Sequence, residues 1–177
     1  MGAKQIPLMQ RGESSTILGQ RYSLDIAVDL VADTPQYWVV DAPTLSSEKV
    51  VEFISRSLKT KLSSVNLRIL LDSSGYTRGA QINTWNANKR VEDAPNTALT
   101  ESFSISTPST LGVVREIDFA GKDGDRKNGA SGINNNIGPL ILKEDSSIVV
   151  ELLSEETQMV ILSYNFVERP TIYYPVL

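Results

Sequence analysis

The stretch from Gly138 to Arg169 constrains the fold most strongly, because it contains three segments with the two-residue periodicity of β-strands. These segments are 140–143, 148–153 and 159–167, and polar connections of four or five residues separate them. Alternation places seven apolar side chains on one face: Ile148, Val150, Leu152, Val160, Leu162, Tyr164 and Phe166. Three strands cannot bury such a face by themselves, so a second sheet from earlier in the chain has to cover it.

The preceding chain supplies strands for this second sheet. Strand character is present in segments 22–32, 37–40, 65–71, 80–85, 99–107 and 113–119. In the last of these segments we expect Val113, Ile117 and Phe119 to face the core. Eight or nine short strands with turn signals every 8–15 residues predict an all-β protein, an antiparallel β-sandwich.

The segment 41–62 fits two structures. One helical face would carry apolar side chains, and Ser46 or Ser47 could cap its start, which predicts one short helix near 47–60. The members of that face are Val50, Val51, Ile54, Leu58 and Leu62. The run from Lys49 to Ile54 also has the β-branched and aromatic bias of a strand. We expect the helix and keep the strand as the alternative.

The chain of 177 residues is expected to form one domain with two arms. Residues 1–20 show no periodic spacing of apolar residues and are predicted to form an extended N-terminal arm. Residues 21–169 are predicted to form the β-sandwich. Residues 170–177 contain two prolines and are predicted to form a C-terminal arm. The run from Ala120 to Gly138 is the longest without strand or helix character, and loops of this length are commonly functional. We therefore expect the two arms and this loop to be contact surfaces.

Charge and missing residue types exclude several function classes. The net charge of −4 and pI near 4.9 argue against nucleic acid as a partner, and no apolar run approaches the 18 residues of a membrane-spanning helix. Because the chain has no histidine and no cysteine, it lacks a Ser-His-Asp triad, a thiol nucleophile and the usual zinc ligands. We expect no enzyme activity and no cofactor.

Acidic residues are candidates for two kinds of chemistry, acid-base catalysis and calcium binding. A carboxylate pair of the glycosidase kind could be formed by Glu151 with Glu155 or Glu156, or by Glu92 with Asp93, but these positions are typical of solubilising charge. Oxygen ligands for calcium could come from Asp118, Asp123, Asp125 and Asn128. In the ligand pattern of a helix-loop-helix calcium site, their spacing places Lys127 at a ligand position, and no bidentate glutamate follows. A solvated glycine-rich loop is therefore the favoured interpretation, and no metal site is predicted.

Aromatic and basic residues are the candidates for partner contact. Trp38, Tyr76 and Trp85 could form a platform for sugar stacking, although tryptophan in a sandwich more often packs in the core. The loop from Gly75 to Gly79 is expected to expose Tyr76 and Arg78. The predicted partner-binding residues are Tyr76, Arg78, Arg126, Lys127, Tyr173 and Tyr174.

The segment GPLILKEDSSIVVEL (138–152), followed by VILSYNF (160–166), resembles the last strands of the jelly-roll structural proteins of tailed-phage virions, in particular capsid decoration or cement proteins. The resemblance covers about a fifth of the chain and implies a jelly-roll-like sandwich without catalytic residues. It further implies a homo-oligomer, with a trimer favoured, that binds the major capsid protein or another virion protein. The expected location is the virion, assembled in the host cytoplasm. A carbohydrate- or receptor-binding β-sandwich module is the alternative.

Overall fold

The computed structural model describes residues 21–62, 64–86, 98–120, 132–135 and 140–170, with side chains for all of these except 118–120 and 132–135. The described residues form twelve β-strands and one 3-10 turn, η1 (Leu45–Ser47). The strands are β1 (Arg21–Leu30), β2 (Gln36–Asp41), β3 (Lys49–Thr60), β4 (Val65–Leu71), β5 (Arg78–Ile82), β6 (Thr84–Asn86), β7 (Glu101–Ile105), β8 (Val113–Ala120), β9 (Gly132–Asn135), β10 (Leu140–Leu142), β11 (Ser147–Ser154) and β12 (Gln158–Pro170). No helix among these residues is long and apolar enough to cross a membrane.

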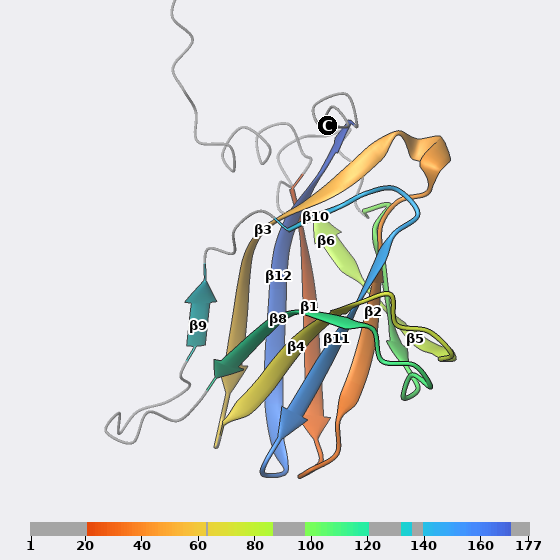
Figure 1. Cartoon of the computed structure of the whole chain (residues 1–177). Helices are drawn as coiled ribbons and strands as arrows, with labels where there is room; N and C mark the ends of the chain where they lie inside the picture. Colours follow the sequence, from red (N-terminus) through yellow and green to blue (C-terminus); the bar gives the residue numbers. More distant parts are fainter. Residues whose placement is uncertain (1–20, 63, 87–97, 121–131, 136–139, 171–177) are drawn as a thin grey trace, which may run out of the picture.

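The strands form two antiparallel sheets that face each other (Figure 1). Sheet A has the order β10-β3-β12-β1-β6, with β9 also paired to β3, and sheet B has the order β5-β7-β2-β11-β4-β8. Two rows of four strands, β10-β3-β12-β1 and β8-β4-β11-β2, form the frame, and the chain changes sheet at most connections between them. This strand order is that of a jelly roll, so the predicted antiparallel β-sandwich is confirmed.

The core lies between the sheets, and the last two strands contribute to it as expected. All seven side chains predicted to face inward from 148–166 are buried in one hydrophobic cluster. Earlier strands supply the opposing residues, including Leu24, Trp38 and Leu67. Aromatic rings contact one another across neighbouring strands, with centroids 5.4 Å apart for Phe53 and Tyr164. Each such buried side chain contributes about 1.5–3 kcal/mol of hydrophobic stabilisation, which explains why this region holds the sheets together.

The predicted helix near 47–60 is wrong, because this segment forms β3. It lies inside sheet A, paired with β12 on one side and with β9 and β10 on the other. The pairing with β12 shifts register at Ile54, so Val51 and Leu58 both reach the core although they are seven residues apart. This β-bulge disturbs the two-residue period and imitates the spacing of a helical face.

The predicted inward face of the strand at 113–119 is also wrong. Val113 and Ile117 are exposed, and the side chain of Phe119 lies outside the described residues. A register shift at Arg115 changes the alternation of β8 against β4, and Glu116 then lies opposite the core residue Ile69. Glu116 forms an ion pair with the buried Arg56, at 2.7 Å, so this pair holds Ile117 on the outer side.

Two further segments differ from expectation. The strand predicted at 80–85 is divided between sheets, since β5 pairs with β7 in sheet B and β6 pairs with β1 in sheet A. The run 120–138, expected to lack strands, contains β9. Residues 1–20, 121–131, 136–139 and 171–177 lie outside the description, so the division into arms and body stays a prediction.

Candidate functional site

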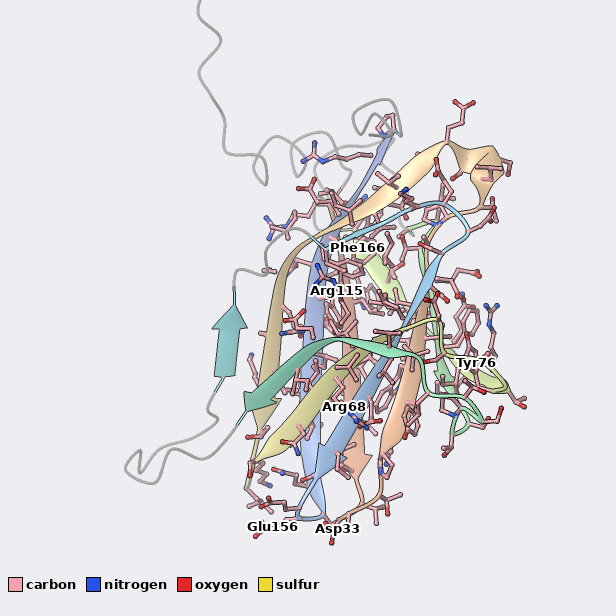
Figure 2. The ribbon with its side chains drawn as sticks, viewed as in Figure 1. Asp33, Arg68, Tyr76, Arg115, Glu156 and Phe166 are labelled. Atoms are coloured by element: carbon pink, nitrogen blue, oxygen red, sulfur yellow. The ribbon has the colours of Figure 1, made fainter. Side chains whose placement is uncertain are left out.

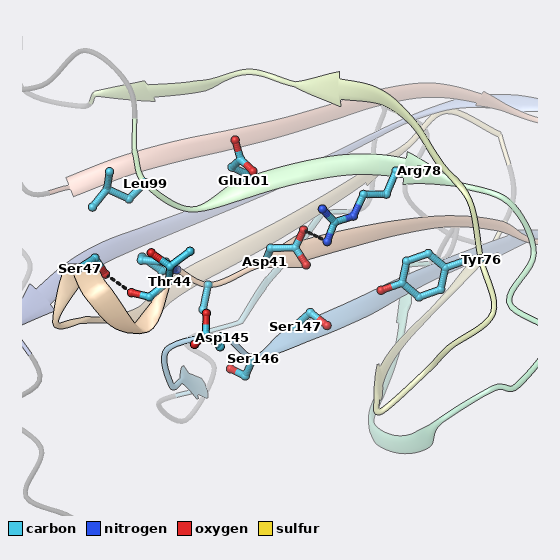
Figure 3. A pocket seen from close by; sticks show the side chains of 12 residues that line it. Asp41, Thr44, Ser47, Tyr76, Arg78, Leu99, Glu101, Asp145, Ser146 and Ser147 are labelled. Carbon is cyan, nitrogen blue, oxygen red and sulfur yellow. Dashed lines mark hydrogen bonds and ion pairs between the residues drawn. The ribbon is translucent and has the colours of Figure 1, made fainter.

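Tyr76 and Arg78, two of the predicted partner-binding residues, line a pocket of about 550 Å³ (Figure 3). The pocket lies where β2 ends and where β7 and β11 begin, because Asp41 pairs in register with Glu101 on one side and with Ser147 on the other. Its remaining lining residues are Ala42, Pro43, Thr44, Ser47, Leu99, Asp145 and Ser146.

Backbone hydrogen bonds connect the two loops that form one wall. The amide of Ala42 donates to the carbonyl oxygen of Ser146 at 2.9 Å, and the amide of Asp145 donates to the carbonyl oxygen of Pro43 at 3.0 Å. Asp145 has a positive φ of 55°, a conformation that aspartate tolerates better than most residues and that turns the chain tightly before β11. The hydroxyl of Ser47 donates to the carbonyl oxygen of Thr44 at 2.6 Å (Figure 3). This wall is therefore built before any ligand binds.

The charged centre of the pocket is the ion pair between Arg78 and Asp41, with 2.7 Å between Nη2 and Oδ2. The Arg78 guanidinium also lies over the ring of Phe103, at 5.1 Å from its centroid, which limits the directions the side chain can take. Burial raises the pKa of the Asp41 carboxyl above its ordinary value; Arg78 partly offsets this effect, and the nearby Glu101 carboxylate adds to it. The pocket thus holds a carboxylate that is costly to keep ionised.

The lining favours neutral or cationic polar ligands. Three carboxylates (Asp41, Glu101 and Asp145) face one guanidinium, so the lining is net negative when all are ionised. Hydroxyl groups and the ring of Tyr76 complete a surface that can exchange hydrogen bonds with hydroxyl or amine groups. No cluster of three or more acidic side chains arranged to hold a metal ion occurs in the part of the chain that the structure describes.

Glu151, considered above as half of a catalytic pair, forms a tight ion pair instead. Arg68 donates to it from Nε and Nη2, at 2.6 Å each, across the outer face of sheet B (Figure 2). Burial, the charge of Glu151 and a hydrogen bond to that carboxylate raise the pKa of the neighbouring Tyr37. Glu155 and Glu156 are exposed in the turn before β12. Glu151 therefore connects β11 to β4 within sheet B through this ion pair.

The three aromatic residues considered as a sugar platform do not form one surface. Trp38 is 4% exposed and belongs to the core, whereas Trp85 is 57% exposed. Trp85 pairs in register with Ser23, on the outer side of sheet A. Tyr76 packs on the outer side of sheet B, against a small cluster that contains Tyr37 and Val39. Only Tyr76 lines the pocket.

The acidic half of the pocket was not predicted from the sequence. Asp41, Glu101 and Asp145 are far apart in the sequence, and only strand pairing brings them together. The one local signal is that Asp41 and Asp145 each end or precede a strand of apolar residues. The other candidates lie outside the described side chains: Arg126, Lys127, Tyr173, Tyr174, Glu92, Asp93, Asp118, Asp123, Asp125 and Asn128.

Comparison with protein-family models and with curated proteins finds no match, so function has to be argued from the fold and the pocket.

Proposed function

We propose that this chain is a non-enzymatic structural protein of a virion, of the decoration type, which binds the major capsid protein or another virion protein in the assembled shell. The observation that carries the proposal is the strand order of the two sheets. Jelly rolls with this arrangement recur in viral capsid proteins, and also in lectins and cupins. Because one fold serves many functions, the contact surface has to support the choice.

The pocket rim supports a role in protein contact. It presents an aromatic ring and a guanidinium, Tyr76 and Arg78, on a wall that backbone hydrogen bonds hold in place. Tyrosine and arginine are enriched among the residues that dominate binding energy at protein interfaces. A preformed rim loses little conformational entropy when a partner binds. The predicted contacts at Arg126, Lys127, Tyr173 and Tyr174 remain part of the proposal.

The mechanism is stabilisation by mass action. A protein that binds only the assembled lattice shifts assembly towards that lattice, by an amount set by its concentration relative to its dissociation constant. Homo-oligomerisation would multiply the contacts made by each decorating unit. The location that follows is the virion, assembled in the host cytoplasm.

The test is direct detection of the chain on particles. Particles purified from the source culture are examined by quantitative mass spectrometry and by immunogold labelling with an antibody against the chain. A fixed copy number per particle and surface labelling are expected. Detection only in the particle-free fraction would refute the proposal. Rebinding to stripped particles should weaken in Arg78→Ala, while Trp85→Ala, an exposed position on the other sheet, serves as the matched control.

The second candidate is a module that binds a neutral glycan, and the composition of the pocket favours it. Carboxylates and a guanidinium beside serine and threonine hydroxyls can pair with vicinal sugar hydroxyls, and Tyr76 offers a ring for stacking. A glycan array followed by calorimetry tests it. Binding that is lost in Glu101→Gln and Tyr76→Ala, and kept in Trp85→Ala, would support this function over the first.

A further inference from the structure

Exposed apolar side chains are concentrated along one strand, β8, and the turn before it. Leu111 is 48% exposed, Val113 68%, Val114 41% and Ile117 56%. Single exposed apolar residues are ordinary on protein surfaces, but Val114 and Ile117 lie on the same outer face of β8, opposite Leu70 and Arg68, and form an apolar strip there. Exposure of this strip to water is unfavourable in free energy, so covering it with a partner would be favourable.

The strip lies on β8, which is an edge strand of sheet B among the described residues. β8 pairs with β4, and no other strand of the described residues pairs with its second edge. Proteins usually protect such an edge with charges, prolines or a covering segment, since its unpaired amide and carbonyl groups can bind another strand. Among the described side chains of β8, those of residues 113–117, Arg115 is the one exposed charge, while Glu116 is turned towards Arg56.

The orientation of this strip is a stable property of the fold. The ion pair between Glu116 and the buried Arg56 connects β8 in sheet B to β3 in sheet A. Because Glu116 faces the core, Ile117 has to face outward; the register shift at Arg115 likewise places Val114 opposite Leu70, on the outer side of the sheet. Figure 2 shows Arg115 on this strand and Tyr76 near the opposite edge of the same sheet, so the strip is separate from the pocket.

We propose that β8 pairs antiparallel with β8 of a second copy of this chain, around a two-fold axis between Arg115 and Glu116. In this register Val114 of each copy lies opposite Ile117 of the other, so the exposed apolar side chains cover one another on the outer face. Arg115 of each copy then lies beside Glu116 of the other, and opposite charges meet twice. A register centred on Glu116 would instead place two carboxylates directly opposite each other, which is unfavourable.

A second copy fits this edge better than an unrelated strand, because the edge is complementary to itself. An isologous contact needs the same surface on both partners, and the sequence Val114-Arg115-Glu116-Ile117 reads as apolar, positive, negative, apolar. Residues 114–117 carry one positive and one negative charge, so the four central positions of the pairing bring no net charge together despite the overall charge of −4. The pairing does not depend on the proposed function, and it predicts a dimer as the basic unit in place of a trimer.

The first test measures mass in solution. Light scattering of the full chain over a concentration series is expected to show a dimer, and Ile117→Lys should raise the dissociation constant more than about tenfold. Met159→Lys is the matched control, since Met159 is similarly exposed at 48% but lies on β12 in sheet A. A monomer or trimer in the parent chain would overturn the proposal, as would an unchanged dimer in Ile117→Lys. Particle labelling tests the proposed function separately.

The second test determines the register of the β8 pairing by disulfide cross-linking. Because the chain contains no cysteine, only the introduced cysteines can form a disulfide. Under mild oxidation, a mixture of Val114→Cys and Ile117→Cys chains is expected to form a cross-linked dimer in higher yield than either variant alone. The reason is that directly opposite side chains approach disulfide distance, whereas Val114 of one copy and Val114 of the other are offset along the strands. Equal yields in all three samples would overturn the register.

Discussion

Replacing Glu116 with glutamine removes the carboxylate that faces a buried arginine, and the structure allows the cost to be estimated. The side chain of Arg56 is 2% exposed and that of Glu116 is 29% exposed, with 2.7 Å between Nη2 and Oε1. Removing one partner of a fully buried ion pair costs about 3–5 kcal/mol. Because Glu116 keeps partial contact with water, we expect Glu116→Gln to lower the free energy of unfolding by about 2–3 kcal/mol, nearer the value of a hydrogen bond to a charged group.

The two partners should differ in their effect. Arg56→Met leaves a carboxylate that water can reach, whereas Glu116→Gln deprives a buried guanidinium of this charge, so Glu116→Gln should be the more damaging. The double variant Arg56→Met/Glu116→Leu removes both charges and should recover most of the loss. The expected fall in Tm for Glu116→Gln is about 4–12 °C for a chain of this length.

Urea unfolding followed by circular dichroism at neutral pH measures these differences. Glu155→Gln, an exposed carboxylate in the turn before β12, is the matched control and should change the free energy of unfolding by less than about 0.5 kcal/mol. The reasoning is refuted if Glu116→Gln costs no more than this control, or if Arg56→Met costs more than Glu116→Gln.

Three further outcomes follow from the pKa directions and the exposure of single residues. Burial raises the pKa of Asp41 above 3.8, so the folded state holds this proton more tightly than the unfolded state does. The free energy of unfolding should therefore fall as the pH rises from about 4 through the raised pKa. Asp41→Asn should remove this pH dependence in unfolding curves taken between pH 3 and 7. Burial and Glu151 raise the pKa of Tyr37 above 10.0, so stability should also fall as the pH rises above about 10, and an equal slope in Tyr37→Phe would contradict this. Acrylamide should quench the fluorescence of Trp38→Phe, which retains the exposed Trp85, several times more strongly than that of Trp85→Phe, and the reverse order would place Trp38 outside the core.

Local periodicity was sufficient for most of the fold. Where the core-facing side chains keep a two-residue period, as in β1, β4 and the segments 148–152 and 160–166, the sequence predicts both the strand and the face directed at the core. It failed where a register shift interrupts the alternation: at Ile54 the bulge imitates a helical face, and at Arg115 it reverses the orientation of β8. A bulge depends on the partner strand, so the sequence of one strand cannot show it.

The candidate site was predictable only in part, for the same reason. The loop composition of Gly75–Gly79 was enough to propose Tyr76 and Arg78, because turn residues mark exposed loops. It could not indicate that Asp41, Glu101 and Asp145 would surround them, since these residues meet only through strand pairing and loop contacts.

The order of apolar and polar residues alone determined that this chain is a β-sandwich, and which side chains of its last two strands face the core, because the alternation of side chains along a strand is a local pattern. The acidic pocket and the outward apolar strip of β8 were decided only by tertiary structure. The pocket depends on which strands become neighbours, and the strip depends on the ion pair between Glu116 and Arg56; these are long-range contacts that a local pattern does not contain.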